Sequence, residues 1–127
     1  MTTDASVRAA VLAGGWPRPW QWGQSDCCQF VRFCIRHIHG IDIMSAIPAY
    51  RTETEALILL YPSLADVVSR VFGDPAQSHA PARPALVRVP GADDDVLALT
   101  YSGGAICHSD TGLRRIPLGF VVCEWEV

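Results

Sequence analysis

The apolar positions along the chain follow two different periods in its two halves. Up to about residue 73, apolar residues recur every three or four positions, which is the period of a helix with one buried face. From residue 85 onward they form short runs separated by turn-type residues, as β-strands do. This order predicts an α+β domain in which N-terminal helices pack on a C-terminal antiparallel sheet.

Four helices are expected in the first half. The first covers residues 4–13 and ends at a Gly-Gly pair, and each of the other three begins at a capping residue. In each case the capping residue is followed three positions later by an acidic or amide side chain, as a capping box requires. The three pairs are Asp26 with Gln29, Thr52 with Glu55, and Ser63 with Asp66, and the helices end at Gly40, Pro62 and Gly73.

Five short strands are expected in the second half, at residues 85–89, 96–101, 105–109, 114–118 and 120–127. The "SGG" at 102–104 is typical of a tight hairpin turn between the second and third strands. Because successive strands are joined by short turns, the pattern predicts an antiparallel meander.

Composition bounds the kind of protein. The chain has 127 residues, of which half are hydrophobic and 18% are charged, so we expect one folded domain over residues 1–127. A net charge of −3 without a Lys/Arg cluster gives no indication of a nucleic-acid partner. The apolar run near the N-terminus is too short and too polar for a signal peptide or a membrane span, which predicts synthesis in the cytoplasm.

The five cysteines do not form a metal-binding pattern, because no C-x-x-C pair occurs. A zinc site made from Cys27, Cys28, Cys34 and His37 would need ligands scattered around one helix. We therefore expect no metal site and no cofactor. The remaining thiols, at Cys107 and Cys123, are expected with Cys34 to be small buried side chains in a reduced protein.

The pair in "DCCQFV" contains the best candidate for chemistry. Cys27 is the expected first residue of a helix, where unpaired N–H groups and the helix dipole favour a thiolate. It lies on the stripe that should face the protein interior, and Cys28 is turned about 100° away, at the edge of that stripe. The structural alternative is that Cys27 only fills the top of a helix–sheet contact.

Three tryptophans precede this helix in a Pro-rich connector. Trp16, Trp20 and Trp22 could line a glycan or peptide groove beside Cys27, or they could pack at the edge of the core. We take Trp22, together with Asp26, as the candidates for a substrate groove.

The motifs resemble a known superfamily. "DCCQFV" resembles the "DCSGFV"-type motif of the NlpC/p60 superfamily of papain-like cysteine peptidases, and "VLALTYSGGAICHSD" resembles its "HVGIYLGDGRFIHAS" hairpin. The chain is also similar to a branch of this superfamily found among phage and prophage tail genes. The segments that carry this second resemblance are "WGQSDCCQFV", "YRTETEA", "DTGLRRIPL" and "EWEV".

The resemblance implies site residues, with one departure. Cys27 falls on the nucleophile and His108 on the third, orienting position, but the general-base histidine falls on Val96. The Gly-Asp that precedes the first strand in the family is also replaced, by Pro84-Ala85. Since a thiol nucleophile needs a group that takes and returns a proton, the base would have to be His108, Asp95, or a histidine from elsewhere in the chain or from a neighbouring subunit.

Two functions follow from the resemblance. The first is a papain-like protein made in the bacterial cytoplasm and assembled with other tail proteins at the hub or tip of the virion tail, its catalysis impaired or lost. The alternative is an active cell-wall endopeptidase or amidase that cleaves peptidoglycan peptide stems, using Cys27 with His108 or another base.

Overall fold

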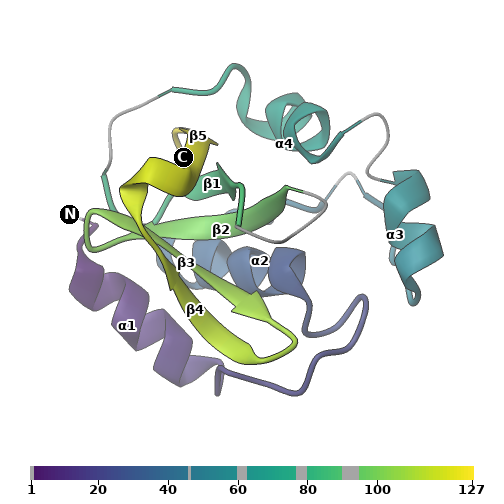
Figure 1. The fold of residues 1–127 in the computed structure, drawn as a ribbon, viewed down its shortest axis with the longest axis horizontal. Helices are drawn as coiled ribbons and strands as arrows, with labels where there is room; N and C mark the ends of the chain where they lie inside the picture. The colour runs from purple at the N-terminus through teal and green to yellow at the C-terminus, as the bar shows by residue number, and fades with distance from the viewer. Residues whose placement is uncertain (1, 46, 60–62, 77–79, 90–94) are drawn as a thin grey trace.

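The computed structural model describes residues 2–45, 47–59, 63–76, 80–89 and 95–127. Helices precede strands along these ranges, which confirms the predicted α+β class (Figure 1). The elements are α1 (Asp4–Ala13), α2 (Cys27–His39), α3 (Glu53–Leu59), α4 (Leu64–Phe72), β1 (Pro84–Val87), β2 (Val96–Tyr101), β3 (Gly104–Ser109), β4 (Gly112–Ile116), the 3-10 helix η1 (Leu118–Phe120) and β5 (Val121–Glu124). Within them, no helix is long and apolar enough to cross a bilayer.

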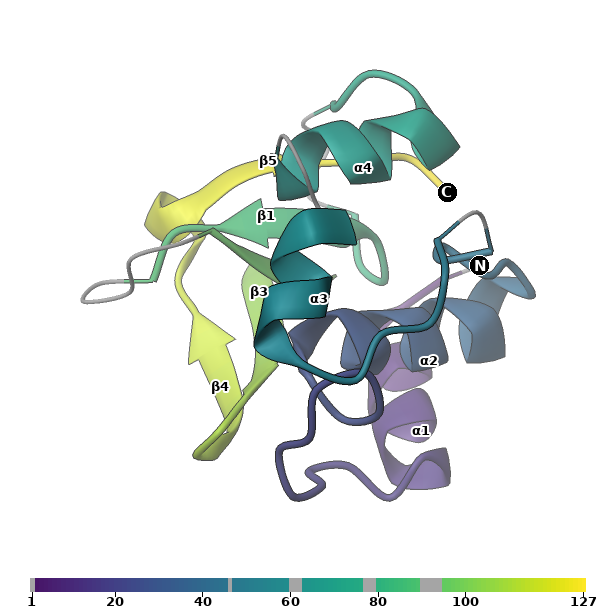
Figure 2. The same cartoon turned by 90° about the vertical axis from the view of Figure 1, so that its right-hand side faces the viewer.

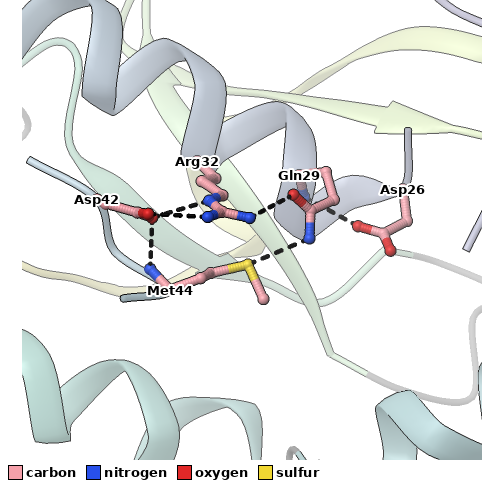
Figure 3. Close-up of polar contacts among 5 residues, drawn as sticks. All are labelled: Asp26, Gln29, Arg32, Asp42 and Met44. Carbon is pink, nitrogen blue, oxygen red and sulfur yellow. Dashed lines mark hydrogen bonds and ion pairs between the residues drawn. The ribbon is translucent and has the colours of Figure 1, made fainter. Parts of the chain in front are cut away.

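Local capping explains where the helices begin. At α3 the predicted capping box is complete, because Thr52 Oγ1 accepts from the Glu55 N–H and Glu55 Oε2 accepts from the Thr52 N–H. At α2 only one half forms: Asp26 Oδ1 accepts from the Gln29 N–H at 2.9 Å. The Gln29 side chain turns instead to Arg32 and Met44 (Figure 3). The predicted end of α3 at Pro62 falls outside the described residues.

The sheet is not the predicted meander. Its strand order is β4-β3-β2-β1-β5, so β5 pairs with β1 and not with β4, which precedes it in the chain. β1 pairs on one side with β2. Its other edge presents backbone groups that need partners. The 3-10 helix η1 carries the chain across to that edge, where β5 supplies those partners. The buried Trp125 then donates from Nε1 to Ser69 Oγ at 3.0 Å, which holds α4 against the β1–β5 side (Figure 2).

Both faces of the sheet bury apolar side chains, in two separate clusters. The face toward α2 contributes Leu86, Leu97, Leu99 and Ile106 to a core shared with α1 and α2. The other face forms a second cluster, of Val87, Val89, Ala98, Ala105, Cys107 and Ile116. All of β1 and the four inner residues of β2 and of β3 are therefore buried, whichever face they occupy.

The β2–β3 hairpin confirms the predicted turn and sets the register of the site. Ser102 and Gly103 both have positive φ, 52° and 76°, as a two-residue turn with primed geometry needs. Leu99 is consequently paired with Ile106. Because side chains alternate along a strand, His108 lies on the α2 face with Ile106, whereas Val96 lies on the opposite face.

Candidate functional site

Cys27 is the first residue of α2, as predicted, and its side chain is half-buried. The burial of Cys27 and Cys28 differs from the prediction, which placed Cys27 on the buried stripe and Cys28 at its edge. Cys28 precedes Val31 and Ile35 by three and seven positions, so it points into the core and is only 5% exposed. Its Sγ lies 4.0 Å from that of Cys27. Cys27 is thus the accessible thiol of the pair, and Cys28 is the thiol beneath it.

The environment of the pair favours a thiolate on Cys27. The hydrogen bond from Cys28 lowers the pKa of Cys27, and backbone N–H groups of Leu97 and Cys28 act in the same direction. Burial and the nearby Asp26 carboxylate oppose this effect. The same hydrogen bond, followed by burial, raises the pKa of Cys28. The sulfur that ionises more readily is therefore the one that is accessible.

Two pockets of about 370 Å³ each meet at Cys27, and both are lined by Trp20, Trp22 and Val96. We call them together the Cys27 groove. The side toward β3 is completed by Val89, Cys107, His108, Ser109, Asp110 and Arg114. The side toward α3 is completed by Asp26, Cys28, Tyr50, Glu53, Ala56, Leu57, Ser63, Leu64 and Asp95. The predicted groove residue Trp22 and the two predicted catalytic residues thus line one continuous surface.

His108 lines the groove but does not hydrogen-bond to Cys27. Its ring is fully buried, stacked 6.0 Å from Trp20 at an interplanar angle of 4° and edge-on to Trp16 at 4.9 Å. Its Nε2 atom lies 2.8 Å from the Arg18 carbonyl oxygen and 3.2 Å from the Arg18 backbone nitrogen. Its Nδ1 atom has no hydrogen-bond partner within the described ranges. His108 therefore holds the connector that carries the tryptophans.

Two further positions bear on the base: Val96, where the resemblance expects it, and the candidate Asp95. Val96 lines the groove beside Cys27, on the sheet face opposite His108. The Asp95 carboxylate forms an ion pair with Arg88, at 3.0 Å. His79, a histidine from elsewhere in the chain, falls outside the described residues. Of the side chains in the described ranges, Cys28 is the only one that hydrogen-bonds to the Cys27 sulfur.

Asp26 shapes the groove rather than presenting a free carboxylate. It is 1% exposed and accepts hydrogen bonds from the Gly23 N–H, the Gln29 N–H and the Tyr50 hydroxyl, at 2.8, 2.9 and 2.7 Å. Burial, followed by the proximity of Cys28 and Asp26, raises the pKa of Tyr50 far above its usual range. Tyr50 was not a candidate on sequence grounds, because nothing in its local pattern indicates a partner 24 positions earlier.

The cysteines do not assemble a metal centre in the part of the chain that the structure describes, where no three His, Cys, Asp or Glu side chains are placed to hold an ion. Cys34 is fully buried in the core, and burial raises its pKa to about 12. Burial likewise raises the pKa of Cys107 to about 11. At neutral pH these raised pKa values keep both thiols protonated.

The fold and the groove define a class of protein: an α+β domain with an accessible thiol at the start of a helix packed against an antiparallel sheet. The chain belongs to the family described as a domain of unknown function, DUF6950, whose model matches residues 4–127. No curated protein and no solved structure matches the chain.

Proposed function

We propose that this chain is a papain-like domain of the NlpC/p60 type, a component of a phage or prophage tail near its tip, in which catalysis has been lost. The order of elements supports the family assignment, because a cysteine-initiated helix is followed by an antiparallel hairpin with His108 on its second strand. The resemblance to tail-gene products extends from the connector to the C-terminus. The groove supports a common ancestry with the peptidases, since it brings Cys27 and His108 to one surface.

The surroundings of Cys27 carry the proposal that catalysis is lost. A cysteine peptidase needs a group near the sulfur that removes its proton and later protonates the leaving amine. Here the sulfur is hydrogen-bonded to Cys28, whose raised pKa keeps it a neutral thiol that does not take up the proton of Cys27. His108 is bonded through Nε2 to Arg18. The position where the resemblance expects the base is Val96, whose side chain can neither take up nor return a proton.

A structural role is compatible with the geometry of the groove, because its polar groups also stabilise the fold. Asp26 caps α2 and joins it to Tyr50, and His108 joins β3 to the connector. Apolar side chains near the end of the chain, Leu118, Phe120 and Val122, are each more than 40% exposed. Such side chains are suited to contacts with neighbouring tail proteins.

Digestion of purified peptidoglycan tests the loss of catalysis. Wild type and Cys27→Ala are compared by the soluble peptides each releases, with an active endopeptidase as the positive control. We expect no release above background from either protein. Release by the wild type and not by Cys27→Ala would establish the alternative, an active endopeptidase or amidase.

Tail assembly tests the structural role. The gene is deleted from the phage or prophage genome, and particles are examined by electron microscopy after complementation with wild type or Cys27→Ala. We expect loss of complete tails on deletion and full rescue by both proteins. Normal tails in the deletion strain would contradict the structural proposal.

The alternative function has one observation in its favour, which is the lowered pKa of Cys27 in a groove that also contains His108. For His108 to act as the base, one of its ring nitrogens would have to reach the sulfur; Nε2 is bonded to Arg18, whereas Nδ1 has no hydrogen-bond partner in the described ranges. The digestion experiment separates the two functions without any assumption about that movement.

A further inference from the structure

A second pocket, of about 400 Å³, lies on the outer side of α2. It is formed between the helix and the connector before it, and it is lined by Trp16, Arg18, Gln24, Gln29, Arg32, Phe33, Arg36 and His37. None of these residues lines the Cys27 groove. The five residues from α2 recur at three- and four-residue spacing, so they form one continuous stripe of the helix. On the sequence pattern alone, Arg32, Arg36 and His37 of this stripe are expected on a solvated helix face.

The pocket concentrates positive charge in a chain whose net charge is −3. Three of its lining residues are arginines, one is a histidine, and none is an aspartate or glutamate. Arginine presents a planar set of donors that matches the oxygens of phosphate and carboxylate groups. The lining is therefore complementary to an oxyanion.

Contacts within the pocket hold two of the guanidinium groups in place. Arg18 lies over the rings of Trp16 and Phe33, at 4.3 and 5.6 Å, and its Nε donates to the Gly14 carbonyl at 2.8 Å. Arg32 makes two 2.8 Å bonds to Asp42 and a third, of 3.2 Å, to Gln29 (Figure 3). Such prior ordering reduces the entropy that a ligand must overcome.

The three arginines of the pocket differ in whether a carboxylate already neutralises their charge. Asp42 neutralises Arg32 directly. Neither Arg18 nor Arg36 forms an ion pair with a carboxylate in the described ranges, although Arg36 is close enough to Asp42 to contribute to the lowered pKa of that group. Arg18 and Arg36 thus leave positive charge at the pocket that no neighbouring carboxylate satisfies by contact.

We propose that this pocket is a binding site for a small ligand carrying a phosphate-type oxyanion. Arg18 and Arg36 supply the charge, Gln24 and His37 line the same pocket as further polar partners, and Trp16 and Phe33 form the apolar wall. The proposal is independent of the function of the Cys27 groove, because the two surfaces share no residue.

Titration with pyrophosphate tests the proposal. Because Trp16 lines the pocket, tryptophan fluorescence reports binding, and isothermal titration calorimetry measures the affinity. We expect saturable binding by the wild type in buffer of constant ionic strength. Arg36→Gln should weaken it about tenfold, the loss of one charge-assisted contact. Arg51→Gln is the matched control, because it removes the same charge from an exposed residue outside the pocket.

Two outcomes would overturn the proposal. One is the absence of saturable pyrophosphate binding by the folded wild type. The other is equal weakening by Arg36→Gln and Arg51→Gln, which would mean that the anion responds to overall charge. An acidic hexapeptide is titrated in parallel; tighter binding of the peptide than of pyrophosphate would also contradict a phosphate-type site and would assign the pocket to a carboxylate-bearing partner.

Discussion

The Nε2 atom of His108 lies 2.8 Å from the carbonyl oxygen of Arg18, a residue 90 positions earlier in the chain. This contact joins β3 to the connector before α2, and it occupies one of the two ring nitrogens, while Nδ1 has no hydrogen-bond partner in the described ranges. The indole of Trp20 lies parallel to the same ring. The histidine thus positions one wall of the Cys27 groove, and its removal should affect stability as well as the groove.

Two substitutions separate the packing of His108 from its hydrogen bond. His108→Ala removes a fully buried ring, and we expect a loss of roughly 3–5 kcal/mol in the free energy of unfolding. His108→Phe keeps a ring for Trp16 and Trp20 but leaves the Arg18 backbone groups unpaired, for a loss of about 1–3 kcal/mol. Urea unfolding followed by fluorescence measures both. Wild-type stability of His108→Phe would show that the Arg18 contact contributes nothing.

The reactivity of Cys27 should depend on the donor beneath it. Cys28→Ala removes the thiol that lowers the pKa of Cys27, whereas Cys28→Ser keeps a donor at the same place. Below its pKa, the thiolate fraction falls about tenfold for each unit by which the pKa rises. We therefore expect slower alkylation of Cys27 by iodoacetamide at neutral pH in Cys28→Ala than in Cys28→Ser, with the rates converging at alkaline pH.

Peptide mapping by mass spectrometry gives the alkylation rate of each cysteine separately. Cys34 and Cys107, whose pKa values burial raises, serve as internal slow references in every variant. Equal rates at Cys27 in the two Cys28 variants across the pH range would contradict the role of the donor.

Asp26 should contribute to stability through its three hydrogen bonds. Asp26→Ala removes the cap of α2 and the acceptor for Tyr50, and we expect a loss of about 2–4 kcal/mol. Tyr50→Phe removes only one of the three bonds, so about 1 kcal/mol is expected. Thermal unfolding of the two variants measures the difference. A larger effect of Tyr50→Phe than of Asp26→Ala would contradict this arrangement.

Gly23 and Gly40 form a matched pair for testing how closely the backbone of Gly23 approaches that of Tyr50 beside the groove. Both have positive φ, 79° and 73°, but a Cβ on Gly23 would lie 1.8 Å from the Tyr50 carbonyl oxygen, whereas nothing lies within 4 Å of one on Gly40. Gly40→Ala carries only the backbone penalty of about 1–2 kcal/mol. Gly23→Ala adds a clash with backbone, so we expect clearly greater destabilisation in denaturant unfolding. Equal losses would mean that the Tyr50 segment moves away without cost.

The position of Cys27 in the groove could be predicted from the sequence, whereas the contact between His108 and Arg18 could not. The start of α2 follows from Asp26 and Gln29, which are three positions apart, so Cys27 could be assigned to the helix start directly. The resemblance identified His108 as a site residue. Its contact with Arg18 uses the backbone of a distant segment, and backbone groups carry no residue-specific signal.

The four helix starts, the two-residue hairpin and the α+β order could all be predicted, because capping and turn geometry involve residues that are close in the chain. Long-range packing instead places β5 beside β1, directs Cys28 and not Cys27 into the core, and puts Val96 and His108 on opposite faces. Each of these depends on which surfaces meet when distant segments bury their apolar side chains and pair their backbone groups.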